Sequence, residues 1–140
     1  MIDETRTVFW DSGQVCMIDQ IALPHRFEIA RYDTYQDVAA AIKTMVVRGA
    51  PAIGAAAGFG MALAAATSTA TSADALRRDL RAAGDVLAAS RPTAVNLFWG
   101  IDRMLRRAAD PALDSADALR AALLAEAQRI ADEDIAINQR

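Results

Sequence analysis

The chain has 140 residues and a formal net charge of -3; 54% of its residues are hydrophobic and 24% are charged. This length suits one domain with a sizeable core, and the composition excludes a disordered chain. It also excludes a general nucleic-acid-binding protein, because neutralising phosphates needs a dense basic face and no arginine run here is longer than a pair. Cys16 is the only cysteine, so we expect no disulfide or cysteine metal cluster, and a reducing, cytoplasmic setting.

Short alternating segments dominate the first thirty residues. Apolar and polar residues alternate over residues 8–17, on both sides of the turn sequence Asp11-Ser12-Gly13, which predicts a β-hairpin. The alternation resumes over residues 26–31 and predicts a third antiparallel strand.

From residue 33 onward the apolar residues follow a helical period. Thr34 and Asp37 resemble a capping box at the start of a first helix, and Gly49 is placed to end it. A second helix is expected over about residues 52–66, with Pro51 in its first turn. Three more helices are expected to begin near Ser72, Thr93 and Ser115.

The uncharged run over residues 49–73 is long enough to span a bilayer. It is mostly Ala and Gly, however, whereas a spanning helix draws its transfer energy from larger apolar residues. We therefore predict a buried helix and no membrane partner. Its glycines, Gly54, Gly58 and Gly60, each cost about 1 kcal/mol relative to Ala in a helix. Such a cost indicates that other backbones or a ligand come very close.

These elements predict a mainly α fold with a small N-terminal antiparallel β-sheet, which is an α+β fold. A β region over residues 1–32 is expected to pack on a bundle of about five helices over residues 33–140, and together they form one domain. No internal repeat or linker is expected.

Two of the expected helix starts carry an arginine shortly before a proline. Arg48 precedes Gly49-Ala50-Pro51, and Arg91 precedes Pro92-Thr93. Unpaired backbone N–H groups favour an anion at a helix N-terminus, and an arginine adds charge, so the two segments together suit one phosphate. From the residues alone a simpler interpretation stays open and is favoured. In that interpretation Arg48 complements the dipole at the end of the preceding helix, and Arg91 is a solvated loop residue.

Candidates for nucleophilic, acid–base or metal chemistry are poor. Cys16 in a predicted strand and His25 in the next loop are more typical of a packed thiol and a surface imidazole than of a catalytic pair. The acids, Glu126 and Glu133 among them, are spread over helix faces and are expected to be solvated. No metal-ligand spacing and no nucleotide-binding glycine motif is present. The residues therefore favour binding over catalysis.

Three segments resemble the methylthioribose-1-phosphate isomerase family of methionine salvage. They are residues 45–54 (MVVRGAPAIG), Ile18-Asp19-Gln20 with Leu23-Pro24-His25, and residues 91–97 followed by Trp99 and Asp102-Arg103-Met104. In order and spacing the resemblance covers nearly the whole chain. It implies conversion of the aldose 5-methylthioribose-1-phosphate into the ketose 5-methylthioribulose-1-phosphate without a cofactor. It also implies that Arg48, Gly49, Ala50 and Arg91 bind this sugar phosphate.

The same resemblance implies that the catalytic groups lie elsewhere. The family places its catalytic cysteine and aspartate in a second, Rossmann-like domain after the helical one, and Cys16 does not match that cysteine. We therefore expect no catalytic residue in this chain, no activity of the chain alone, and a missing C-terminal domain as its partner. Members of the family usually form homodimers, so a homodimer is expected for the full-length form.

Two other functions stay open. The superfamily includes regulatory subunits of the guanine-nucleotide exchange factor for eukaryotic translation initiation factor 2, which act through protein contacts, and it includes ribose-1,5-bisphosphate isomerases. The presence of Arg48 and Arg91 with the Pro51-containing segment favours the methylthioribose enzyme over both.

Overall fold

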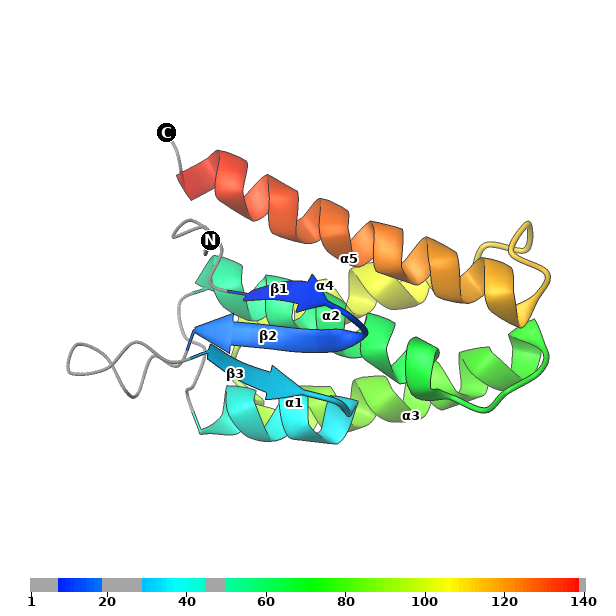
Figure 1. Cartoon of the computed structure of the whole chain (residues 1–140), viewed down its shortest axis with the longest axis horizontal. Helices are drawn as coiled ribbons and strands as arrows, with labels where there is room; N and C mark the ends of the chain where they lie inside the picture. Colours follow the sequence, from blue (N-terminus) through cyan, green and yellow to red (C-terminus); the bar gives the residue numbers. More distant parts are fainter. Residues whose placement is uncertain (1–7, 19–28, 45–49, 139–140) are drawn as a thin grey trace.

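The computed structural model describes residues 8–18, 29–44 and 50–138 (Figure 1). In order, the strands are β1 (Val8–Asp11), β2 (Gln14–Ile18) and β3 (Ile29–Tyr32), and they form one antiparallel sheet in the order β1-β2-β3. The helices are α1 (Tyr35–Lys43), α2 (Ala50–Thr67), α3 (Ala73–Ser90), α4 (Val95–Ala108) and α5 (Ala116–Asn138). The predicted mainly α fold with a small N-terminal antiparallel sheet is confirmed.

The hairpin forms at the predicted turn. Ser12 and Gly13 have φ values of 53° and 78°, and they make a two-residue loop between the paired residues Asp11 and Gln14. Two left-handed residues in such a loop match the right-handed twist of the strands. The third strand begins at Ile29, and residues 26–28 of the predicted strand lie outside the described residues.

Local hydrogen bonds explain where three helices begin. The hydroxyl oxygens of Thr34, Ser72 and Ser115 each accept a bond of 3.1 Å from the backbone N–H three residues later. Each bond pairs one of the donors that a helix N-terminus leaves free, which confirms the predicted starts of α1, α3 and α5.

The predicted end of α1 is wrong. The helix ends at Lys43, and Thr44 caps it in place of Gly49. The Thr44 hydroxyl and its backbone N–H both donate to the carbonyl of Ala40 at 2.9 Å, so the last turn is closed by local bonds that need no glycine. Gly49 itself lies outside the described residues.

Helix α2 forms the centre of the molecule. Every residue from Ile53 to Ala65 is buried, and the other helices and the sheet surround it (Figure 1). Trp10 of the sheet stacks on Phe59 of α2 with ring centroids 6.3 Å apart. A helix that is apolar on all sides is buried either in a core or in a membrane. Within the described part of the chain, none of the helices has both the length and the apolarity needed to cross a bilayer, and the prediction of a buried helix is confirmed.

The glycines of α2 allow its neighbours to approach. A Cβ atom added at Gly58 would lie 3.1 Å from Ile130 Cδ1 of α5, and one added at Gly60 would lie 3.2 Å from Val38 Cγ1 of α1. Both distances are shorter than ordinary van der Waals contact, so a larger residue at either position would require its neighbour to move.

A six-residue sequence, Ser-Ala-Asp-Ala-Leu-Arg, occurs at residues 72–77 and again at 115–120. The prediction that the chain has no internal repeat is therefore wrong at this length. Both copies begin a helix with a capping serine, and both place their leucine, Leu76 or Leu119, fully in the core.

Each copy ends in an arginine that bonds to the backbone at and just beyond the C-terminal end of another helix. Arg77 donates to the carbonyl oxygens of Ala108, Asp110 and Leu113 at 2.6, 3.0 and 2.7 Å. Arg120 donates to those of Ala65, Ser68 and Ala70 at 2.9, 2.8 and 2.8 Å. Since helix C-termini leave carbonyl groups unpaired, the two arginines stabilise the ends of α4 and α2.

Candidate functional site

The two segments that carry the candidate arginines meet through α2 and α4. A Cβ atom added at Gly54 would lie 3.7 Å from the carbonyl oxygen of Asn96 and 3.7 Å from the ring of Trp99, and one added at Gly100 would lie 2.8 Å from the carbonyl oxygen of Gly54. Because residues early in α2 face residues early in α4, both helices begin at the same end of the molecule (Figure 1).

The start of α4 differs from the prediction. Thr93 does not cap the helix, and Pro92 does not open it. A turn closed by a 3.0 Å bond from the Ala94 N–H to the Arg91 carbonyl comes first, and α4 begins at Val95. Proline suits the second position of such a turn, which explains why it lies before the helix. Arg91 is half-buried and caps the end of α3.

The first turns of α2 and α4 carry no acidic residue, whereas α1, α3 and α5 carry Asp37, Asp74 and Asp117 there. In addition, no side chain caps α4, because its N-cap residue is Ala94. A carboxylate in a first turn compensates the positive end of the helix dipole. In α2 and α4 no acidic residue of the first turn therefore compensates the positive end of the helix dipole.

The predicted site residues fall unevenly on the described structure. Ala50 is the first residue of α2, and Arg91 lies in the turn that precedes α4. Arg48 and Gly49 lie outside the described residues, so their predicted contact with a phosphate stays a prediction. The lack of acidic residues in the first turns of α2 and α4 is a further indication of an anion site, and it can be read from the sequence.

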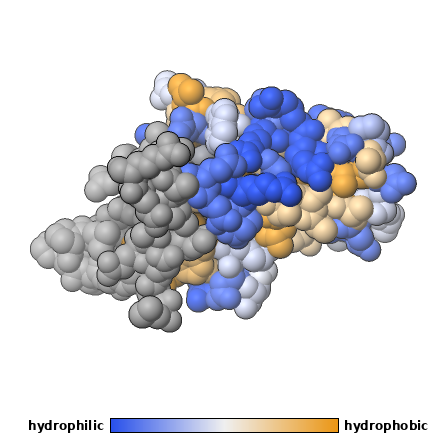
Figure 2. Space-filling model, turned by 90° about the horizontal axis from the view of Figure 1, so that it is seen from above, coloured by the Kyte–Doolittle hydropathy of each residue, from blue (hydrophilic) through white to orange (hydrophobic). Residues whose placement is uncertain are grey.

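An apolar surface follows the start of α4, formed by Val95, Phe98 and Trp99, which are 76%, 42% and 46% exposed. We call these three residues the apolar edge. Seen from the side of α5, the described surface of the molecule carries hydrophilic and apolar areas next to each other (Figure 2). Neighbouring exposed residues of this size often mark a contact with another protein surface.

An ion-pair network joins α4 to α5 next to this edge. Arg103 donates to Glu126 at 2.7 Å and to both carboxylate oxygens of Glu133, at 3.0 and 2.6 Å. Arg129 also donates to Glu126 at 2.6 Å. The guanidinium carbon of Arg103 lies 5.5 Å from the ring centroid of Trp99, which is a cation–π contact. The prediction that Glu126 is solvated is wrong, since it is only 9% exposed and is paired with two arginines.

The network shifts the pKa values of its members. Burial alone would raise the pKa of Glu126, but the hydrogen bonds from Arg103 and Arg129 outweigh it, and the pKa lies below the usual 4.5. The hydrogen bond from Arg103 likewise lowers the pKa of Glu133, and the bond to Glu133 raises the pKa of Arg103. All three groups are therefore charged near neutral pH.

Glu126→Gln tests this network. A carboxyl whose pKa is lowered by folding stabilises the protein above its unfolded pKa, and this stability is lost as the pH falls through the folded pKa. We expect the variant to be less stable by about 1 kcal/mol at pH 7 and the difference to shrink below about pH 4. Urea unfolding followed by circular dichroism at both pH values measures it. Asp85→Asn, at an exposed position of α3, is the control and should change little; a difference that does not depend on pH would contradict the assignment.

Cys16 is a packed thiol. It is fully buried in β2, and burial raises its pKa, an effect that the nearby Arg31 only partly offsets. A reactive cysteine needs a thiolate that is accessible, so Cys16 is a poor nucleophile, as predicted. His25 lies outside the described residues.

The fold and the site define a small α+β domain in which two helices begin side by side without an acidic residue in their first turns. Residues 46–140 match the model of the initiation factor 2 subunit family. The chain belongs to this family.

Curated relatives extend the match to nearly the whole chain. Methylthioribose-1-phosphate isomerase of Synechococcus sp. is 47% identical over 134 residues, which are 96% of this chain and 38% of the relative. The enzyme of the same name from Chloroflexus aurantiacus is 49% identical over 134 residues, 96% of this chain and 39% of the relative. The resemblance inferred from the motifs is confirmed, and the chain spans less than two-fifths of the length of these relatives.

Two solved structures share the fold. The 5-methylthioribose 1-phosphate isomerase from Pyrococcus horikoshii OT3 superposes with a TM-score of 0.87 at 44% identity, and the match covers 91% of this chain and 36% of that one. The translation initiation factor eIF-2B, subunit delta, from A. fulgidus superposes with a TM-score of 0.85 at 42% identity, covering 91% and 37%.

Proposed function

We propose that this chain is the substrate-binding N-terminal domain of a methylthioribose-1-phosphate isomerase. The observation that carries the proposal is the pair of helices α2 and α4, which begin side by side with no acid in either first turn. The phosphate of 5-methylthioribose-1-phosphate is the anion that the proposal assigns to this end. Arg48, Gly49, Ala50 and Arg91 are the proposed contacts, and no cofactor is needed for binding.

The proposed domain comprises a β region over residues 1–32 and a helical bundle over residues 33–140. Its activity is proposed to require a C-terminal catalytic domain, in agreement with the larger size of the relatives. The chain alone should therefore bind the sugar phosphate and not convert it. We place the complete enzyme in the cytoplasm as a homodimer.

The apolar edge supports the same proposal. Val95, Phe98 and Trp99 lie beside the proposed phosphate site, so a catalytic domain that covers them would also enclose the substrate. Exclusion of water from such a site strengthens its electrostatic contacts. We assign the apolar edge to contact with this catalytic domain.

A protein-interaction module is the second candidate. The eIF-2B delta subunit superposes with a TM-score of 0.85 at 42% identity, close to the 0.87 at 44% of the isomerase structure. The fold therefore supports an interaction module nearly as well as it supports an isomerase domain. The two candidates differ at the anion site, because only the isomerase must bind a sugar phosphate there. Ribose-1,5-bisphosphate isomerase is a third alternative, and it differs in the substrate.

Isothermal titration of the 140-residue chain with 5-methylthioribose-1-phosphate tests the proposal. We expect binding without turnover, and about tenfold weaker binding by Arg91→Met, since one charge-assisted contact is removed. Arg106→Met is the matched control, because Arg106 is exposed and, among the residues that the structure describes, pairs only with Asp102 at an i,i+4 spacing. The affinity of this variant should equal that of the wild type.

Three results would count against the proposal. Turnover by the chain alone would contradict the assignment of catalysis to another domain. If Arg91→Met and the wild type bound 5-methylthioribose-1-phosphate equally tightly, Arg91 would not contact the substrate. Tighter binding of ribose-1,5-bisphosphate than of the methylthio sugar would favour the other isomerase.

A further inference from the structure

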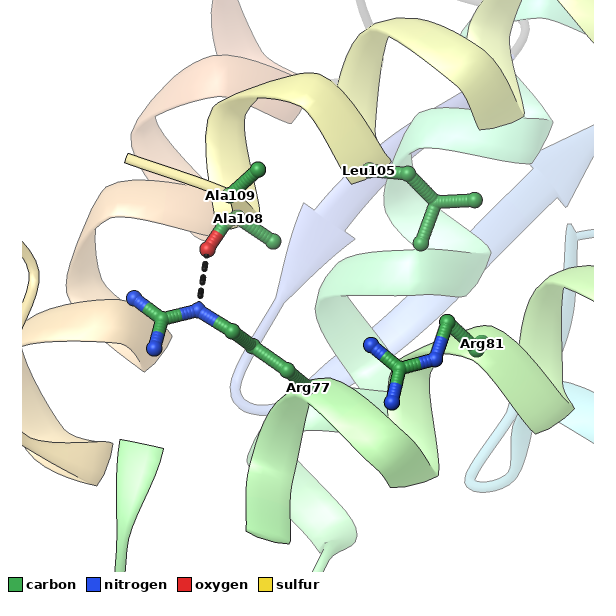
Figure 3. A pocket seen from close by; sticks show the side chains of 5 residues that line it. All are labelled: Arg77, Arg81, Leu105, Ala108 and Ala109. Atoms are coloured by element: carbon green, nitrogen blue, oxygen red, sulfur yellow. Dashed lines mark hydrogen bonds between the residues drawn. The ribbon is translucent and has the colours of Figure 1, made fainter. Parts of the chain in front are cut away.

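A pocket lies between α3 and α4, away from the proposed phosphate site (Figure 3). It has a volume of about 200 Å³ and is lined by Arg77, Arg81, Leu105, Ala108 and Ala109. The last three residues belong to the C-terminal end of α4 or follow it, whereas the phosphate site is placed at the N-terminal end. The length of α4, 14 residues, separates the two by about 20 Å.

Arg77 forms a fixed wall of this pocket. A guanidinium has five N–H donors, and Arg77 uses four of them, three on backbone carbonyls and one on Asp74 at 3.1 Å. Its bond to the Ala108 carbonyl, drawn in Figure 3, also compensates part of the negative end of α4. Arg77 therefore shapes the pocket but has little capacity left to bind a ligand.

Arg81 is the free cation of the pocket. It lies one helical turn after Arg77 on α3, and within the described ranges it makes no hydrogen bond or ion pair. Figure 3 shows its guanidinium and the Leu105 side chain on opposite sides of the pocket. The described lining has no acidic side chain, and its remaining surface comes from Leu105, Ala108 and Ala109. A charged group and an apolar wall thus face the same small volume.

We propose that this pocket binds a small organic acid, a carboxylate on a short apolar chain. The planar fork of Arg81 matches a carboxylate in a bidentate pair, and the apolar chain would lie against Leu105 and Ala109. The volume of about 200 Å³ is below the usual 300 to 1,000 Å³ of ligand pockets, so a small ligand with a short apolar chain suits it best. This site is independent of the proposed function, because it shares no residue with the phosphate site.

Amide chemical shifts of the 140-residue chain, titrated with butyrate, test this proposal. We expect saturable shifts of Leu105, Ala108 and Ala109 with a dissociation constant in the millimolar range. 1-Butanol, which has the same chain length and no charge, should bind at least fivefold more weakly. Arg81→Met should weaken butyrate binding about fivefold, and Arg78→Met, at the exposed neighbouring position of α3, should leave it unchanged.

The following outcomes would overturn the proposal. Equal shifts with butyrate and butanol would show that the carboxylate is not recognised. If Arg81→Met bound butyrate as tightly as the wild type, the Arg81 guanidinium would not contact the ligand. Equal affinity for inorganic phosphate and butyrate would show that the apolar wall contributes nothing.

Discussion

Gly100→Ala is expected to destabilise the protein by about 2 kcal/mol, although alanine is the better helix former. The added Cβ would lie 2.8 Å from the carbonyl oxygen of Gly54 and 3.0 Å from Ala57 Cβ. The first of these atoms belongs to the backbone of a buried helix and cannot rotate away. The two helices must therefore separate, and contacts along the whole α2–α4 interface weaken. Urea unfolding followed by circular dichroism measures the loss.

Gly54→Ala is the matched control, since it makes the same change on the facing helix. Its Cβ would lie 3.7 Å from the Asn96 carbonyl oxygen and from the Trp99 ring, which is ordinary contact. We expect this variant to be as stable as the wild type or up to about 1 kcal/mol more stable. If both variants lost the same stability, the close approach at Gly100 would not be the cause.

Arg120→Met is expected to destabilise the protein by about 2 to 4 kcal/mol. Methionine keeps the apolar stem but leaves the carbonyl groups of Ala65, Ser68 and Ala70 without their donor. Arg120→Lys should recover less than half of the loss, because one ammonium on a flexible stem does not reproduce the planar fork. Thermal unfolding of the three proteins gives the comparison.

The partner of Arg120 in the same motif supplies the control. Asp117 pairs with Arg120 at 3.2 Å, but its side chain is 99% exposed, so Asp117→Asn should cost less than about 0.5 kcal/mol. A large loss from Asp117→Asn would mean that the ion pair contributes much of the stability. No loss from Arg120→Met would mean that the carbonyl bonds do not stabilise the end of α2.

Features that depend on local sequence could be predicted. The caps at Thr34, Ser72 and Ser115 need only a hydroxyl and a backbone N–H three residues away, so the sequence carries their full signal. Thr93 carries the same signal, yet the turn between Arg91 and Ala94 comes first and moves the helix start to Val95. Where the sequence of a turn and the sequence of a helix start overlap, the local pattern alone does not decide which of the two forms.

Features that depend on tertiary contact could not be predicted. Glu126 has the sequence surroundings of a solvated helical acid, and only the packing of α4 on α5 buries it beside Arg103. The bonds of Arg120 reach residues 50 to 55 positions away. Two of the four predicted site residues, Ala50 and Arg91, lie at the same end of the molecule. This follows from the packing of α2 on α4, which the sequence does not reveal.

The side-by-side, same-direction arrangement of α2 and α4 has an energetic consequence. Two parallel helices place like ends of their dipoles together, and neither first turn holds a carboxylate that would reduce the repulsion. An anion at this end would neutralise both. Occupancy and folding would then be linked by mass action, so that a ligand at a hundred times its dissociation constant adds about 2.7 kcal/mol to the free energy of unfolding. The folded fraction of the domain would thereby depend on the concentration of its ligand.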